Sequence, residues 1–250
     1  MFKNLQKNCN LFLNQGQQIV DVDVHAHVLP FLDNGPSSIE ESLDMCDMLA
    51  NLGFRQCIVT PHIMSIYYEN SEKNIIEICS DLQSRIEEAN IPIKLKAAAE
   101  YYIDESFIKK LKSFSPLLTL DDNEYHILIE TAFLNEFNFL QYAIERLLMF
   151  GYAPVMAHPE KFNYLFEEDK KINILRKMGL KFQVDLDAFL ESAIKTKKDN
   201  LKYLINNNLI DFVGSNVHSL DSVVDLMNLK ENANFQQILK AGVQNQCLRF

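Results

Sequence analysis

Seven short apolar runs rich in β-branched residues alternate with longer segments of helical periodicity, and this alternation constrains the fold more than any other feature. Strands of this length separated by helices predict an α/β protein with a parallel sheet covered by helices. An open doubly wound sheet and a closed barrel both satisfy the pattern. The GxGxxG turn of a dinucleotide-binding fold is missing after the first run, which disfavours the open sheet. The runs lie at residues 19–24, 56–60, 93–99, 125–130, 153–157, 181–186 and 211–215.

The segments between the runs carry helix start and stop signals. Ser38, followed three residues later by Glu41, predicts a capping box for a helix that ends near Gly53. Two more helices are predicted over residues 135–150 and 168–178, each ending before a glycine.

Composition limits the class of protein. The chain has 250 residues without a repeat or a flexible linker, so we expect a polar N-terminal extension over residues 1–17 and one barrel domain over residues 18–250. A formal net charge of −10 has the wrong sign for binding nucleic acid, and no apolar run is long enough to insert into a membrane. Five scattered cysteines without a CxxC pair, and no export signal, favour a cytoplasmic protein.

Five of the six histidines stand at or just beyond the predicted C-terminal end of a strand. Two carboxylates, Glu100 and Glu130, close the third and fourth strands, whereas His126 lies inside a strand and is predicted to be an ordinary core residue. In a barrel, these strand ends meet at one rim, where functional side chains collect. Imidazoles and carboxylates together match the ligands of Zn, Mn or Fe, so we predict a multinuclear metal site. The histidines are His25, His27, His62, His158 and His218.

Two parts of this set are informative by themselves. His25 and His27 are two residues apart, so on a strand they point to one face and can bind one ion. Glu100 follows three alanines, and a carboxylate buried there requires either a cation or a salt bridge opposite it. Tyr67 and Tyr68 follow the His62 loop and could stack on an aryl phosphate.

Short motifs follow one another between Asp23 and His218. In this order they resemble the polymerase-and-histidinol-phosphatase (PHP) superfamily, and within it the manganese-dependent tyrosine-protein phosphatases of bacterial capsule and exopolysaccharide operons. The resemblance implies a distorted (β/α)₇ TIM-like barrel with metal ions at the C-terminal rim of the strands. The motifs are Asp23-Val24-His25-Ala26-His27, Leu29-Pro30, Asp33-Asn34-Gly35, Thr60-Pro61-His62, Ala99-Glu100-Tyr101-Tyr102, Leu128-Ile129-Glu130, Ala157-His158-Pro159-Glu160 and Gly214-Ser215-Asn216-Val217-His218.

The resemblance also implies a reaction. A metal-bound hydroxide would hydrolyse phosphotyrosine in a protein, such as the tail of a bacterial tyrosine kinase, with two or three Mn²⁺ ions, or Fe or Zn in their place. Glu100 would bridge two ions, and Glu100, His158, Lys161 and His218 would carry catalytic roles. Whether the chains associate into oligomers stays open. The implied metal ligands are His25, His27, His62, Glu100, Glu130, His158 and His218.

Four positions depart from the family pattern. Asn34 and Asn216 stand where the family has metal-binding aspartates. They stay among the predicted metal-site residues, because each can still offer one carbonyl oxygen to an ion, but each change removes a negative charge from the site. Lys161 and Val223 stand where the family has arginines. Two readings besides a tyrosine phosphatase therefore stay open: a weakened or inactive barrel that binds a phosphorylated partner, and a small-molecule phosphoesterase such as histidinol-phosphate phosphatase. The nearby carboxylates that would compensate are Asp33 and Asp185.

Overall fold

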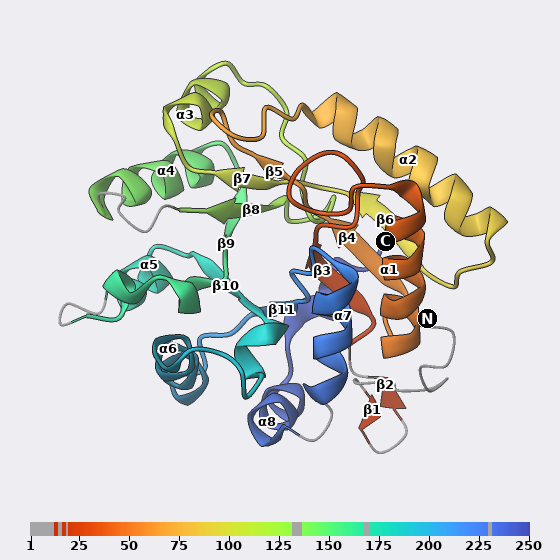
Figure 1. Cartoon of the computed structure of the whole chain (residues 1–250). Helices are drawn as coiled ribbons and strands as arrows, with labels where there is room; N and C mark the ends of the chain where they lie inside the picture. Colours follow the sequence, from red (N-terminus) through yellow and green to blue (C-terminus); the bar gives the residue numbers. More distant parts are fainter. Residues whose placement is uncertain (1–12, 15–16, 19, 132–136, 168–170, 230–231) are drawn as a thin grey trace.

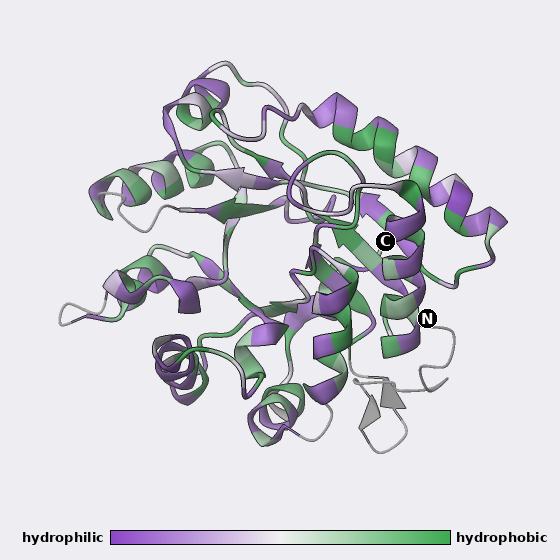
Figure 2. Cartoon of the chain, viewed as in Figure 1, coloured by the Kyte–Doolittle hydropathy of each residue, from purple (hydrophilic) through white to green (hydrophobic). Residues whose placement is uncertain are grey.

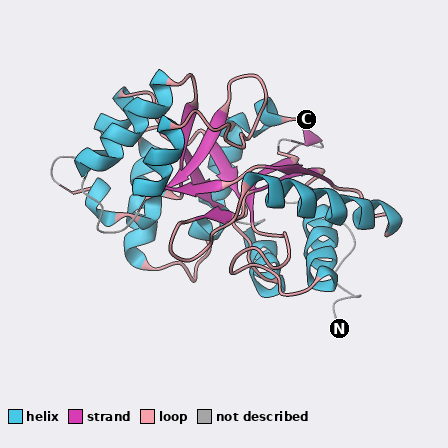
Figure 3. Ribbon diagram, turned by 90° about the horizontal axis from the view of Figure 1, so that it is seen from above, coloured by secondary structure: helices cyan, strands magenta, loops and turns pink. Residues whose placement is uncertain are grey.

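The computed structural model describes residues 13–14, 17–18, 20–131, 137–167, 171–229 and 232–250. Helices surround a central group of strands (Figure 1), and the view from above shows the strands between helices on either side (Figure 3). The helices are α1 (Ile39–Leu52), α2 (Glu72–Glu88), α3 (Glu105–Lys112), α4 (Phe137–Met149), α5 (Lys171–Lys177), α6 (Lys195–Asn206), α7 (Leu220–Leu226) and α8 (Ala233–Ala241). The central strands are β3 (Val22–Ala26), β4 (Gln56–Val59), β5 (His62–Ile63), β6 (Lys94–Ala97), β7 (Glu100–Tyr102), β8 (His126–Glu130), β9 (Ala153–Ala157), β10 (Lys181–Asp185) and β11 (Phe212–Gly214).

The central strands form two sheets in which the strand pairs are parallel, as the alternating pattern predicts. One sheet has the order β11-β10-β9-β8-β7-β5 and the other has the order β3-β4-β6. Each of the seven predicted strands has a counterpart: β3, β4, β6, β8, β9, β10 and β11. A separate antiparallel pair joins β1 (Leu13–Asn14) to β2 (Gln17–Gln18). The prediction of an α/β protein with parallel strands is confirmed.

The predicted end of the third strand is wrong. The run 93–99 was expected to end beside Glu100, but β6 stops at Ala97, and Glu100 begins β7 in the other sheet, opposite His62 of β5. The same change of sheet separates β4 from β5. Pro61 has no N–H with which to continue the ladder, so pairing resumes one residue later.

The two sheets meet beside β3 and β11. The backbone N–H of His27 donates to the carbonyl of Val217 at 3.0 Å, and the N–H of Asn216 donates to the carbonyl of His25 at 2.7 Å. At the other end of these strands, the buried side chain of Asn245 donates to backbone carbonyls of both β3 and β11, at 2.9 and 2.7 Å. These hydrogen bonds hold β11 and the loop after it against β3.

Local signals set several helix ends. The Ser38 hydroxyl caps α1 by accepting from the Glu41 N–H at 3.1 Å, and Gly53 ends this helix with a φ of 117°. The capping box is incomplete, because the Glu41 carboxylate accepts from Ser37 instead of returning to Ser38. The predicted helices over 135–150 and 168–178 correspond to α4 and α5, although residues 135–136 and 168–170 lie outside the described ranges.

The core has two parts. The larger part packs the helices against the outer side of the strands, and Figure 2 shows hydrophobic segments along the strands and on parts of the surrounding helices. A smaller cluster contains apolar side chains from the strands and from the C-terminal segment, among them Val24, Leu128, Phe212 and Leu248. Within the described ranges, no helix is both long and apolar enough to cross a membrane. The division into residues 1–17 and 18–250 stays a prediction.

Candidate metal centre

Five histidines and two glutamates converge at one end of the strands. Strands of both sheets contribute these residues. His25 lies in β3, His62 in β5 and Glu100 in β7, and the others lie at or just after strand ends. Because the central strands run parallel, residues far apart in the sequence reach the same end. The residues that follow or end their strands are His27 after β3, Glu130 at the end of β8, His158 after β9 and His218 after β11.

Glu100 lies at the middle of the histidine cluster and is fully buried. Its Oε2 lies 3.2 Å from His25 Nε2, 3.4 Å from His27 Nε2 and 3.1 Å from His62 Nδ1. Its other oxygen, Oε1, lies 3.0 Å from His158 Nε2. A single carboxylate therefore faces four imidazoles from three segments of the chain.

Glu130 and His218 extend the cluster on two sides. Glu130 approaches His62 Nδ1 to 3.7 Å and His158 Nε2 to 3.6 Å. The ring of His218 stacks on that of His27 with 4.0 Å between centroids. Three groups of side chains have nitrogen and oxygen atoms within 4.8 Å of one another, which is close enough to share an ion: His27, His62 and His218; His25, His27 and Glu100; and His62, Glu100 and Glu130.

The histidines differ in their affinity for protons. Burial lowers the pKa of His62 to about 4 and that of His218 to about 3, and the positive charge of His27 adds to both shifts. Burial also opposes a charge on His27, but hydrogen bonds and charges from Asp33 and Glu100 raise its pKa to about 9. His62 and His218 are therefore neutral at neutral pH, and a neutral imidazole has the lone pair that a metal ligand needs.

The two glutamates are held in opposite states. Burial disfavours the charge on Glu100, but the surrounding histidines, with His25 and His62 contributing most, keep its pKa well below its usual range. Burial and the charge of Glu100 raise the pKa of Glu130 to about 8. Two carboxylates so close in a buried site cannot both stay charged without cations.

Residues behind the cluster fix the orientation of two histidines. Asp33 accepts from His27 Nδ1 at 2.7 Å and also from the backbone N–H groups of His62 and Gly35, at 3.0 and 2.9 Å. Gln183 Oε1 lies 2.7 Å from His25 Nδ1. The sequence analysis named Asp33 only as a compensating carboxylate and did not identify Gln183, which lies between the apolar residues Phe182 and Val184 of β10.

The four departures from the family pattern have different surroundings. Asn34 is exposed, whereas Asn216 donates its amide to Asp185 at 2.7 Å. Lys161 Nζ lies 2.8 Å from Asp185 Oδ2, with the lysine side chain 29% exposed. Val223 is buried in α7 and packs in the core.

A fourth group of carboxylates is balanced by lysines. Glu160, Asp185 and Asp187 lie close together, but Lys161 pairs with Asp185 and Lys197 Nζ lies 2.5 Å from Asp187. Burial raises the pKa of Glu160 to about 8, so this carboxyl is held as the neutral acid. Asp185 and Asp187 are therefore paired with lysines, and no metal ion is needed to balance their charge.

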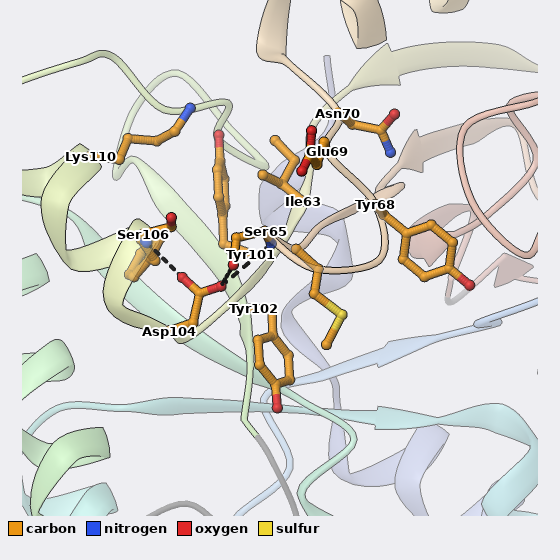
Figure 4. Close-up of a pocket in the computed structure, with 12 residues that line it drawn as sticks. Ile63, Ser65, Tyr68, Glu69, Asn70, Tyr101, Tyr102, Asp104, Ser106 and Lys110 are labelled. Carbon is orange, nitrogen blue, oxygen red and sulfur yellow. Dashed lines mark hydrogen bonds between the residues drawn. The ribbon is translucent and has the colours of Figure 1, made fainter.

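A pocket of about 310 Å³ opens beside the cluster (Figure 4). Tyr68 lines the pocket and also stacks on His62 with 5.5 Å between ring centroids, so this one side chain contacts both the pocket and the histidine cluster. Asp104 ties the pocket together by accepting from the Ser65 hydroxyl at 2.6 Å. Tyr67 is 73% exposed at the tip of this loop.

Two other side chains, Tyr101 and His126, have structural roles. Tyr101 is buried, donates to Glu72 at 3.1 Å and accepts from the Leu118 N–H at 2.8 Å. His126 is buried and bonds Asp121 at 2.9 Å and Lys181 at 2.8 Å. His126 is thus an ordinary structural histidine, as predicted.

The chain is similar to several characterised proteins. The tyrosine-protein phosphatase CpsB of Streptococcus agalactiae is 27% identical over 205 residues, covering 80% of this chain and 84% of the relative. The tyrosine-protein phosphatase YwqE of Bacillus subtilis is 29% identical over 199 residues, covering 80% of this chain and 78% of the relative.

The chain is also similar to solved structures. One structure comes from work on YwqE of Bacillus subtilis and CpsB of Streptococcus pneumoniae, which are described as unique metal-dependent tyrosine phosphatases. It matches this chain with a TM-score of 0.75 at 25% sequence identity, and the match covers 91% of this chain and 93% of that chain. The lactonase Lmo2620 of Listeria monocytogenes gives a TM-score of 0.56 at 11% identity, with 92% and 91% coverage, which shows a shared fold only. Residues 21–235 match the family described as capsular polysaccharide synthesis, CpsB/CapC, so the chain belongs to that family.

Proposed function

We propose that this protein is a metal-dependent phosphatase that hydrolyses phosphotyrosine in a protein partner involved in capsular or exopolysaccharide synthesis. Membership of the CpsB/CapC family and similarity to tyrosine-protein phosphatases over four fifths of the chain support this proposal. The observation that carries it is the buried Glu100 carboxylate with four imidazole nitrogens between 3.0 and 3.4 Å away.

The side chains fit divalent metal ions. Their mixed nitrogen and oxygen donors suit Mn²⁺, and also Fe or Zn. The buried Oδ1 atom of Asn216 has no hydrogen-bond partner among the described residues, as expected of an oxygen that could bind a cation. We propose two or three Mn²⁺ ions held by His25, His27, His62, Glu100, Glu130, His158 and His218, with the amide oxygen of Asn216 as a further donor; exposed Asn34 is not required.

The chain's own groups have distinct tasks. Bound ions would neutralise the phosphate dianion and lower the pKa of a water molecule towards ~7. Glu100, between the histidines, is the group that can reach two ions at once. We propose that Lys161, paired with Asp185 and partly exposed, offers its positive charge to a phosphate oxygen. A tyrosine leaving group, with a parent pKa of ~10, departs with little help from a general acid.

The pocket beside His62 suits the rest of the substrate. Tyr68 contacts His62 and also lines the pocket. A substrate with its phosphotyrosine bound at the metal centre would therefore place neighbouring peptide residues against Tyr68 and Tyr102. We therefore propose a phosphorylated protein as substrate, such as the tail of a bacterial tyrosine kinase, in the cytoplasm. A small metabolite would leave this pocket empty.

We also propose that the two sheets belong to one distorted (β/α)₇ barrel. The backbone hydrogen bonds from β3 to the loop after β11, and the bridging side chain of Asn245, support closure at that edge. A barrel would account for the convergence of residues from β3 and β9 at one rim.

The function is tested with the purified chain, stripped of metal and reloaded with Mn²⁺. We expect hydrolysis of a phosphotyrosine peptide in preference to histidinol phosphate, and loss of at least about a hundredfold in the Glu100→Gln variant, because a neutral amide cannot balance two cations. Glu77→Gln removes the same charge from an exposed helix position and should leave turnover unchanged. Metal binding without any hydrolysis by the parent chain would instead favour a module that binds its phosphorylated partner.

A further inference from the structure

Asp185 lies directly behind the candidate metal centre and organises two amide side chains. It is fully buried at the end of β10. Its Oδ2 accepts from Asn216 Nδ2 at 2.7 Å and from Lys161 Nζ at 2.8 Å, and its Oδ1 accepts from Gln183 Nε2 at 3.2 Å. A carboxylate can only accept, so each amide must turn its NH₂ group towards Asp185 and its carbonyl oxygen away.

For Gln183, this orientation determines the proton on His25. The Gln183 carbonyl oxygen meets His25 Nδ1 at 2.7 Å, so the imidazole carries its proton on Nδ1. His25 Nε2 is then free to act as a ligand, on the side where it lies 3.1 Å from His27 Nε2. Orienting groups of this kind raise the metal affinity of histidine sites.

For Asn216, the same orientation leaves a carbonyl oxygen without a partner. Asn216 donates its amide to Asp185, while its buried Oδ1 accepts no hydrogen bond from the described part of the chain. The backbone places this residue at the centre, because its N–H bonds the His25 carbonyl at 2.7 Å and His218 follows two residues later. A buried carbonyl oxygen beside a histidine cluster is suited to a cation.

We infer that Asn216 is a metal ligand positioned by Asp185: Asn216 presents its amide oxygen to the metal centre, and Asp185, itself paired with Lys161, fixes the orientation of the amide. This inference rests on the proposed metal-dependent function. It explains how an asparagine is compatible with the site. It also predicts that Asn216→Asp alone weakens metal binding. The new carboxylate would face the Asp185 carboxylate across the 2.7 Å at which the two side chains now form a hydrogen bond.

The test is a double-mutant cycle in the full chain with Asn216→Asp, Asp185→Asn and the exchange of both. Mn²⁺ affinity is measured by the loss of the free-ion EPR signal, and folding by thermal unfolding in the presence of a chelator. Each single change should weaken Mn²⁺ binding by about ten- to a hundredfold, and the exchange should recover to within about tenfold of the parent. Asn208→Asp is the matched control, because Asn208 is exposed and has a φ of 52° beside 49° for Asn216.

Three results would overturn the inference. Binding as tight as the parent in Asn216→Asp, or in Asp185→Asn, would show that the pair does not act on the metal, and so would an exchange variant no better than the weaker single variant. If Asn216→Asp does not fold, Asp185→Asn and the exchange decide by the same criteria. A parent chain that binds no Mn²⁺ would refute the proposed function and this inference together, whereas equal binding by all variants would refute the inference alone.

Discussion

Replacing Asp33 by asparagine should uncouple His27 from the metal centre without unfolding the chain. Asp33 accepts three hydrogen bonds, from His27 Nδ1 and from the N–H groups of His62 and Gly35. Together with Glu100, it raises the pKa of His27 from 6.5 to about 9 against the effect of burial. If Asp33 supplies half of that shift, its charge favours the charged imidazole by about 1 to 2 kcal/mol, since one pKa unit is about 1.4 kcal/mol.

The change has two measurable consequences. In the metal-free chain, the pKa of His27 followed by NMR should fall by at least about one unit. Mn²⁺ affinity should fall by about tenfold or more, because an amide has one accepting oxygen in place of two and cannot keep all three hydrogen bonds that orient the imidazole and its loop. Asp44→Asn, at an exposed position in α1, is the control. An unchanged His27 pKa together with unchanged Mn²⁺ affinity would refute the reasoning that Asp33 positions this ligand.

Three further predictions concern pH, substrate and stability. His62 and His218 bind protons more weakly in the folded chain than in the unfolded chain, whereas Glu130 and Glu160 bind them more strongly. In urea unfolding of the metal-free protein, the parent should therefore lose about 1 to 2 kcal/mol more between pH 7 and pH 5 than a His62→Gln variant, which keeps both carboxyl groups; equal pH dependence of the two would contradict the lowered pKa of His62. Tyr68→Ala should raise KM for a phosphotyrosine peptide several-fold more than KM for a small aryl phosphate in steady-state assays, and equal effects on both would exclude the pocket as a peptide site. Arg176→Ala should cost about 2 to 3 kcal/mol of unfolding free energy in urea titrations because it leaves buried Asp211 without its two guanidinium contacts, and a loss below about 0.5 kcal/mol would contradict this.

The sequence predicts the strands and the position of the site for a simple physical reason. Strand periodicity and length are local properties, and parallel strands must end together, so histidines placed after several strands had to meet. The short strands β5 and β7 were not predicted because they are two and three residues long and depend on pairing with neighbouring strands, β5 with β7 and β7 also with β8.

The supporting groups were harder to predict than the ligands. Gln183 reads as one polar residue in a strand, and its role depends on contact with His25, 158 positions away in the sequence. Asp185 was named as a spare carboxylate, but its partners, Lys161 and Asn216, come from two other loops. Such roles depend on tertiary contacts, which no local pattern records.

The most direct measurement is anomalous diffraction from crystals grown with Mn²⁺, recorded on both sides of the manganese absorption edge. We expect at least two peaks beside Glu100, each with imidazole nitrogens of the cluster at about 2.0 to 2.3 Å. A crystal with the cluster intact but no anomalous peak there, or with peaks only on exposed carboxylates, would contradict a metal-dependent phosphatase centred on Glu100.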